Sequence, residues 1–254
     1  MALNMTKKHT IILLRGLLRD QFHWGDFRQT LKSNFPHSNI VCLDIAGNGT
    51  RNNEKTPSSL EGIAQDLHQH FHALQLDHQA DIIAISMGGM IALKWMTLFP
   101  NDIRKAILIN TSTQSLSPFH QRLRWQRYID IFQILCLPNL KQEEKIIHLT
   151  SNKQRDSVEL IALSHQWAHW KEKHPISCSN MFNQLNASRE FILPNKLSQP
   201  ISLLASEQDK LVNYQCSIAL AQYWNLPINI HPTAGHDIPL DDPRWVCEHA
   251  KRFL

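Results

Sequence analysis

A serine, an aspartate and a histidine occupy positions from which they could act together on a carbonyl group. Ser86 stands between two apolar runs, Asp209 lies in a polar segment after residues 201–205, and His236 follows Gly235. A serine hydroxyl is a weak nucleophile until a neighbouring base takes its proton. That base is usually a histidine whose tautomer is fixed by a carboxylate. These residue types therefore indicate nucleophilic attack on an ester-like carbonyl.

Residues 81–99 predict the element that would hold the serine. Residues 81–85 form a short apolar run that is typical of a buried parallel strand. Residues 88–99 carry apolar side chains at helical spacing and stop at Pro100. A strand that turns directly into a helix would expose Ser86 at a strained apex, and the amides after it would favour a developing negative charge. The alternative is an ordinary strand–helix junction with a serine there by chance.

The pattern Ala84-x-Ser86-x-Gly88 resembles the nucleophile elbow of the α/β-hydrolases, which usually reads Gly-x-Ser-x-Gly. Alanine is the smallest residue with a Cβ, so a tight turn remains possible at this position. In that superfamily the chain order is serine, then an acid, then histidine, and Ser86, Asp209 and His236 have this order. The chain is identified as a member of the α/β-hydrolase superfamily, and the resemblance implies that these three residues form a catalytic triad.

Neighbouring acids and histidines are weaker candidates for the same roles. Glu207 competes with Asp209, but Asp209-x-x-Val212 matches the spacing of the superfamily, which leaves Glu207 as a surface residue. His231 falls in a predicted strand end, and His249 falls on the predicted closing helix. A histidine beyond the last strand and before the last helix is the position that the resemblance requires.

The first predicted strand, residues 9–14, leads into Arg15 and Gly16. In the resembled superfamily this strand ends in His-Gly, and the amide of the next residue donates to the oxyanion. By position that residue is Leu17, and Met87 after the serine supplies the second amide. Arg15 stands where that superfamily usually has histidine, which leaves the backbone role intact but alters the local hydrogen bonding that the resemblance implies. An ordinary turn glycine is the alternative interpretation of Gly16.

Strands and helices alternate along both ends of the chain, which favours a mostly parallel sheet of about six strands with helices on both faces. The candidate triad residues all follow predicted strands, at the sheet edge where ligands bind in such folds. The predicted strands are 9–14, 40–45, 81–85, 103–110, 201–205 and 228–231.

The middle of the chain predicts a helical cap. No glycine occurs between Gly89 and Gly235, and prolines divide this stretch into segments with helical patterns, such as 119–137 and 153–173. We expect residues 1–112 and 196–254 to form the α/β core and residues 113–195 to form an inserted cap that roofs the substrate pocket. The alternative is a helical extension that contacts no ligand.

Composition restricts the partners and cofactors. The chain has 254 residues, a net charge of +4 and no long Lys/Arg run, which argues against nucleic acid. No apolar run is long enough to span a membrane, and five scattered cysteines suggest reduced thiols and a cytoplasmic protein. His68 and His72 are spaced to share a metal, but no third ligand is evident in the sequence, so we predict no metal site and no cofactor.

The resemblance implies an ester, thioester or activated amide as substrate. In size, cap and elbow the chain is similar to the esterases that act on pimeloyl-acyl-carrier-protein methyl ester. Arg122, Arg124 and Arg127 lie on the predicted helix 119–137, where they would be solvated or would receive an acidic carrier protein. Two alternatives stay open: a C–C-bond hydrolase or lyase with the same triad, and a non-catalytic ligand-binding module.

Overall fold

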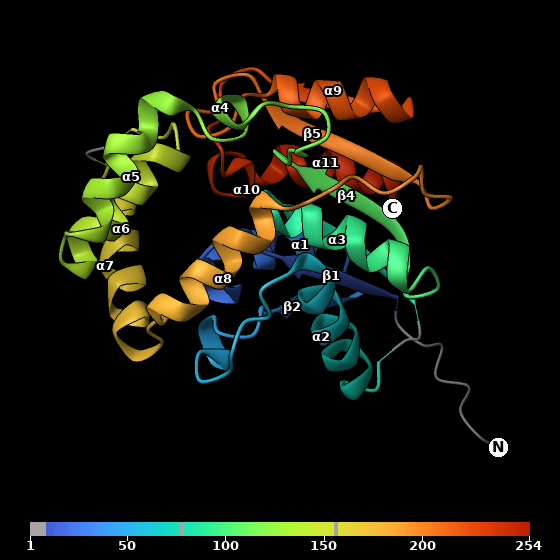
Figure 1. Ribbon diagram of the computed structural model, residues 1–254, viewed down its shortest axis with the longest axis horizontal. Coiled ribbons are helices and arrows are strands. Elements are labelled where there is room, and N and C mark those ends of the chain that lie inside the picture. The colour runs from blue at the N-terminus through green and yellow to red at the C-terminus, as the bar shows by residue number, and fades with distance from the viewer. Residues whose placement is uncertain (1–8, 77–78, 155–156) are drawn as a thin grey trace.

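Six parallel strands form the sheet at the centre of the molecule (Figure 1). The computed structural model describes residues 9–76, 79–154 and 157–254. The strand order is β2-β1-β3-β4-β5-β6, and all neighbouring pairs are parallel. This confirms the predicted fold class. The strands are β1 Thr10–Leu14, β2 Asn39–Leu43, β3 Ala80–Ile85, β4 Ile103–Ile109, β5 Ile201–Ser206 and β6 Ile228–His231.

Alternate side chains of the central strands enter two separate hydrophobic layers. In β1, Ile12 belongs to the core on one side of the sheet and Ile11 to the core on the other. Both are fully buried, as expected for a sheet that helices cover on both faces. The first layer contains residues of α2 (Leu60–Ala73), α3 (Met87–Leu98) and α9 (Gln215–Trp224), and the second contains residues of α1 (Phe27–Asn34) and α11 (Pro243–Phe253).

The segment between β4 and β5 is helical and stands beside the carboxyl ends of the strands (Figure 1). Helices α5, α6 and α7 pack together, and α8 leads back to the core, where Ala187 joins the layer of α2 and α3. The elements are α4 Phe119–Arg122, the 3-10 turn Trp125–Arg127, α5 Tyr128–Leu135, α6 Asn139–Thr150, α7 Val158–Lys173 and α8 Cys178–Arg189.

The helix predicted over 119–137 is wrong as a single element. The chain becomes extended at Leu123 and Arg124, because the Arg124 amide donates to Leu211 O at 2.9 Å instead of continuing a helical ladder. The helix predicted over 153–173 begins at Val158, and residues 155–156 of that prediction lie outside the described residues, as do residues 1–8 of the predicted first core segment.

Short helices complete the loops at the carboxyl edge of the sheet. They are the 3-10 turns Gln21–Trp24 and Gly49–Arg51 and the helix α10, Ile238–Asp241. All five cysteines lie in described ranges and are free thiols. In the described ranges, no helix has both the length and the apolar character needed to cross a membrane.

Candidate active site

Ser86 occupies a strained turn between β3 and α3. Its φ of 57° and ψ of −124° are unusual for a residue with a side chain, and such conformations cost about 1–3 kcal/mol. The end of β4 holds this turn, since the Ser86 amide donates to Ile109 O at 2.8 Å and Thr111 Oγ1 donates to Ser86 O at 3.0 Å. The surrounding hydrogen bonds therefore fix a serine at the carboxyl edge of the sheet.

Two glycines let the loop after β1 approach the serine closely. A Cβ on Gly16 would lie 2.9 Å from Ser86 Cβ, and a Cβ on Gly88 would lie 2.6 Å from Arg15 O. Side chains at either position would push the loop and the serine turn apart. The backbone next to Leu17 thus borders Ser86 on one side, and Met87 at the start of α3 borders it on the other.

Asp209 and His236 are in direct contact. His236 Nδ1 lies 2.6 Å from Asp209 Oδ2, and both side chains are buried. The second oxygen, Asp209 Oδ1, accepts hydrogen bonds from the amides of Leu211 at 2.7 Å and Val212 at 2.9 Å. These bonds orient the carboxylate. Glu207, the competing acid, is exposed.

Asn110 connects the serine turn with the histidine loop, and the sequence analysis did not single it out. It follows β4 with a φ of 48°, a conformation that asparagine tolerates better than most residues. Its Nδ2 donates to His236 O at 2.7 Å, and its Oδ1 accepts from the Ser206 amide at 2.8 Å. Ile109 O accepts from the Ser86 amide, so the consecutive residues Ile109 and Asn110 hold the serine turn and the histidine loop at the end of the same strand. An asparagine at the carboxyl end of the apolar run 103–110 was the available signal.

The Arg15 guanidinium binds Asp237, the residue after His236. Arg15 Nη1 and Nη2 lie 3.2 and 2.6 Å from the two carboxylate oxygens, and both side chains are buried. The guanidinium also lies 4.8 Å from the Trp24 ring centroid. Burial raises the pKa of Asp237, but the Arg15 charge and hydrogen bonds outweigh it and hold this pKa below its ordinary value. The replacement of histidine by arginine therefore links the loop after β1 to the histidine loop.

The end of α6 is hydrogen-bonded to the loops that carry the acid and the histidine. Thr150 O accepts from the Asp237 amide at 2.8 Å. Asn152 Nδ2 donates to Gln208 O at 3.1 Å and to Thr233 O at 3.0 Å, which bridges the two loops. The end of α6 and the residues just after it therefore contact both loops that carry Asp209 and His236.

A second set of buried contacts holds the loop after β1 against the inserted helices. Glu143 of α6 accepts from Arg19 Nη1 at 2.6 Å, and Lys171 of α7 lies 3.3 Å from its other oxygen. Burial raises the pKa of Glu143, but the two cations outweigh it and lower this pKa. Gln184 of α8 accepts from the Leu18 amide at 3.0 Å. The backbone beside Leu17 is therefore anchored on both sides.

The three predicted helix arginines have separate environments. Arg122 Nη2 donates to Ser188 O at 2.6 Å, and Arg127 Nε donates to Lys210 O at 3.3 Å. The Nε atoms of Arg122 and Arg124 are buried and have no hydrogen-bond partner among the described residues. Burial lowers the pKa of Arg122. The prediction that these arginines lie on one helix is wrong, because the chain leaves the helical conformation at Leu123.

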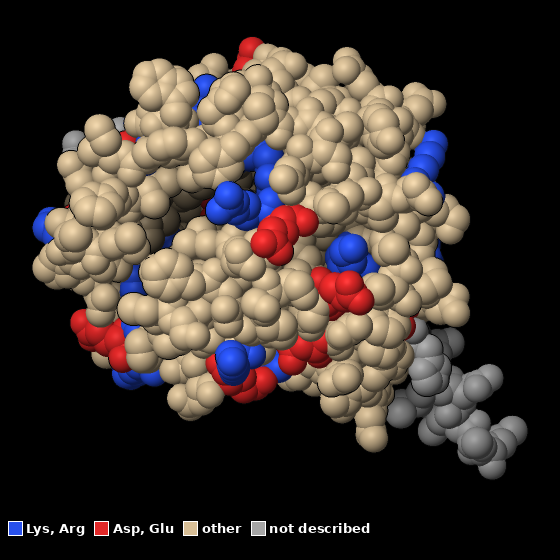
Figure 2. All heavy atoms as spheres, viewed as in Figure 1, with Lys and Arg blue, Asp and Glu red and all other residues tan. Residues whose placement is uncertain are grey.

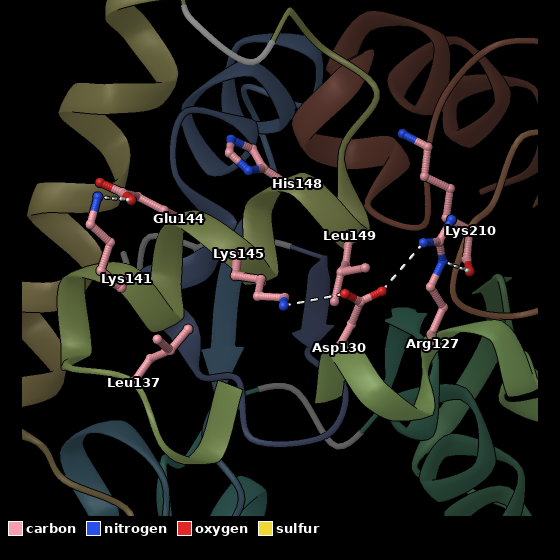
Figure 3. A pocket seen from close by; sticks show the side chains of 9 residues that line it. All are labelled: Arg127, Asp130, Leu137, Lys141, Glu144, Lys145, His148, Leu149 and Lys210. Carbon is pink, nitrogen blue, oxygen red and sulfur yellow. Dashed lines mark hydrogen bonds and ion pairs between the residues drawn. The ribbon is translucent and has the colours of Figure 1, made fainter. Parts of the chain in front are cut away.

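Two hollows mark the inserted helices. In Figure 2 the surface is hollowed between α8 and the group α5–α7, and Lys or Arg atoms lie at its rim. A groove of about 360 Å³ is lined by four Lys and Arg residues and two Asp and Glu residues. Figure 3 shows the side chains that line it. Its lining residues are Arg127, Asp130, Leu137, Lys141, Glu144, Lys145, His148, Leu149 and Lys210.

The parallel sheet and the strand–serine–helix turn define the class of protein: it is an α/β-hydrolase, as the sequence predicted. The family described as "Serine aminopeptidase, S33" matches residues 34–242, so the chain belongs to this family of hydrolases.

Two relatives align with nearly the whole chain. Human (Homo sapiens) monoacylglycerol lipase ABHD6 is 22% identical over 97% of this chain and 75% of its own. A Bacillus subtilis (strain 168) protein is 23% identical over 96% of this chain and 89% of its own, and its provisional name is 2-succinyl-6-hydroxy-2,4-cyclohexadiene-1-carboxylate synthase.

Solved structures share the fold. An esterase from Exiguobacterium antarcticum has a TM-score of 0.76 at 14% identity, with 97% of this chain and 92% of that chain covered. A thermophilic esterase from Thermogutta terrifontis has a TM-score of 0.74 at 19% identity, with 97% and 89% covered.

Proposed function

We propose that the protein is a serine esterase in which Ser86 is the nucleophile, His236 the general base and Asp209 the residue that orients it. The observation that carries this proposal is the 2.6 Å contact between His236 Nδ1 and Asp209 Oδ2 at the sheet edge where Ser86 stands on its strained turn. The esterases and lipases among the relatives support the same reaction class.

In the proposed reaction, Ser86 Oγ attacks the ester carbonyl while His236 Nε2 takes the hydroxyl proton. Asp209 stabilises the resulting imidazolium, and the backbone amides of Leu17 and Met87 donate to the tetrahedral oxyanion. His236 then protonates the leaving alcohol. Water attacks the acyl-enzyme with the same base and releases the acid. Residues 113–195 act as the cap over this site.

For the substrate, we propose an acyl group delivered by an acidic acyl carrier protein, with a pimeloyl methyl ester as one such substrate. The groove of Figure 3 supports an acidic partner, because it carries an excess of cations beside the acid loop. Five free cysteines are typical of a reducing compartment, and we infer a cytoplasmic location.

A second candidate is carbon–carbon bond cleavage or lyase chemistry with the same triad. The Bacillus subtilis relative carries a carboxylate in the name of its product. The buried Nε atoms of Arg122 and Arg124, which have no hydrogen-bond partner in the part of the chain that the structure describes, would suit a carboxylate-bearing substrate. A non-catalytic binding module is disfavoured by the strained serine and the oriented Asp–His pair.

A panel of aryl esters of increasing acyl length, with and without a terminal carboxylate, tests the proposed reaction. We expect the wild type to hydrolyse at least one of these esters and Ser86→Ala to hydrolyse none. If no ester is cleaved, the esterase assignment is wrong.

A carrier-linked ester then tests the partner. Combining Arg127→Ala, Lys141→Ala and Lys145→Ala should raise its KM, and salt should do the same to the wild type, since charge steering is screened. Neither change should affect a small aryl ester. The control pair Lys251→Ala and Arg252→Ala, exposed on α11, should leave both substrates unaffected. Equal KM values for the groove variant and the wild type on the carrier-linked ester would exclude this partner site.

A further inference from the structure

A cluster of two histidines and one aspartate lies at the amino-terminal edge of the sheet, opposite the Ser86 edge. His68 and His72 are on α2, and Asp102 directly precedes β4. Asp102 O accepts from the Ala80 amide at 2.7 Å, which fixes the aspartate to the start of β3. Because all strands are parallel, a full strand length separates this cluster from Ser86.

The three side chains converge on one small volume. His68 Nδ1 lies 2.6 Å from Asp102 Oδ2, and His72 Nε2 lies 3.0 Å from Asp102 Oδ1. One nitrogen from each histidine and one carboxylate oxygen all fall within 4.8 Å of one another. Among residues 9–76, 79–154 and 157–254 this is the one group of three or more potential metal ligands that meets this condition. Asp102 is thus a third potential ligand, which the sequence did not reveal.

Neighbouring aromatic residues hold the ligands in place. The Trp95 indole Nε1 donates to Asp102 Oδ2 at 2.8 Å, and the His68 ring stacks on Phe99 with 3.6 Å between ring centroids. Such outer contacts orient ligands in metal sites and restrict their rotamers before an ion binds. Trp95 is fully buried, whereas His72 is exposed, so the cluster is packed against the core on its inner side and accessible from solvent on its outer side.

The charge of the cluster suits a cation. The Asp102 carboxylate supplies the negative charge of a set whose other donors are imidazole nitrogens. Two imidazoles and one carboxylate are ligands that zinc and the neighbouring divalent transition metals accept, with water in the remaining position.

We propose that His68, His72 and Asp102 bind one divalent transition-metal ion, with Zn²⁺ as the representative ion. The ion would join the last turns of α2 to the turn between α3 and β4. Because the cluster lies at the edge opposite Ser86, the ion stabilises the fold and takes no part in ester cleavage.

Isothermal titration of the full-length, chelator-treated chain with ZnCl₂ tests the site. We expect one ion per chain, and His72→Ala should weaken binding at least about tenfold, as should Asp102→Asn. Two matched controls should bind as the wild type does: His70→Ala on the same helix, and His165→Ala, which breaks the spacing-matched pair with His169 on α7.

Thermal unfolding with and without ZnCl₂ provides the second readout. Because an ion that binds the folded state stabilises that state, ZnCl₂ should raise the Tm of the wild type and of both controls. It should not raise the Tm of His72→Ala. His72 is exposed, so this variant should retain the fold and its ester hydrolysis. Equal zinc affinity in His72→Ala and the wild type, or no stoichiometric binding by the wild type, would overturn the proposal and leave the proposed esterase function unaffected.

Discussion

The two edges of the sheet carry the same contact in different surroundings. At the carboxyl edge, His236 Nδ1 lies 2.6 Å from Asp209 Oδ2, and at the amino edge, His68 Nδ1 lies 2.6 Å from Asp102 Oδ2. Neither the distance nor the pair of residue types distinguishes them. The difference lies in what stands next to each pair.

The carboxyl edge adds a serine in a strained turn, and Asp209 contacts His236 through Oδ2 while its Oδ1 accepts from the backbone amides of Leu211 and Val212. At the amino edge, Asp102 is shared between His68, His72 and Trp95. An aspartate that is bonded to a single histidine can orient that histidine as a base. An aspartate that is bonded to two histidines forms with them a group that resembles a set of metal ligands. A His–Asp contact therefore becomes a candidate triad only through its place in the sheet and its neighbours.

The largest difference between the two edges is expected in kcat when the nucleophile is removed. Ser86→Ala should lower kcat on a cleaved ester by at least roughly 10⁴-fold, because triad members act as a unit. His236→Ala should lose a similar factor, and the double variant should lose little more. His68→Ala, the matched change at the opposite edge, should retain wild-type kcat. Near-full turnover by Ser86→Ala would show that the serine turn is not the reaction centre.

Replacing Asp209 and Asp102 in turn with asparagine tests the same difference between the two edges. Asp209→Asn should lower kcat by roughly 10³-fold or more, though less than Ser86→Ala, because the histidine loses the partner that fixes its tautomer. Asp102→Asn and Glu207→Gln should leave kcat unchanged. Activity loss in Glu207→Gln but not in Asp209→Asn would reverse the assignment of the acid.

Breaking the buried Arg15–Asp237 pair at the carboxyl edge should lower the free energy of unfolding substantially. Asp237→Asn leaves the Arg15 charge buried without its partner, and the free energy of unfolding should fall by about 3–5 kcal/mol at neutral pH. Urea unfolding measures this difference. Asp26→Asn is the control, since Asp26 is exposed and its side chain makes no cap hydrogen bond.

The pH dependence of that difference has a definite sign. The folded-state pKa of Asp237 lies below its ordinary value of 3.8, so its stabilisation is complete above the unfolded pKa and is lost as pH falls through the folded pKa. The gap between wild type and Asp237→Asn should therefore shrink at acid pH. A gap that is constant between neutral pH and acid pH would mean that the ion pair does not stabilise the fold.

At the amino edge the smallest effect is expected. Without added metal, Asp102→Ala removes hydrogen-bond acceptors from Trp95, His68 and His72 and should lower the free energy of unfolding by roughly 1–3 kcal/mol. Its kcat should match the wild type. A large loss of kcat without unfolding would show that the two edges are coupled.

The strands and the order of the candidate residues were predictable because they follow local patterns. The apolar run before Ser86, the glycine before His236 and the polar turn around Asp209 are each visible within a few residues. Parallel strands place such ends at one edge of the sheet, so adjacency of the loops followed from the fold class.

Contacts between distant segments were not predictable. Asp102 is about thirty residues from His68 and His72 in the chain, and no local pattern relates them. The break at Leu123 arises because the next amide pairs with Leu211 O, a tertiary contact that overrides helical spacing. Arg15 was recognised as a departure from the expected histidine, but its partner, Asp237, depends on how the histidine loop folds.

Covalent labelling with a fluorophosphonate serine probe, followed by peptide mass spectrometry, tests the central claim most directly. The proposed mechanism predicts one labelled site, Ser86, with labelling abolished in Ser86→Ala and strongly slowed in His236→Ala and Asp209→Asn. Labelling in Asp102→Asn and His68→Ala should proceed at the wild-type rate. Labelling at another serine, or equal labelling rates in His236→Ala and the wild type, would contradict the claim that the carboxyl edge holds the reactive serine.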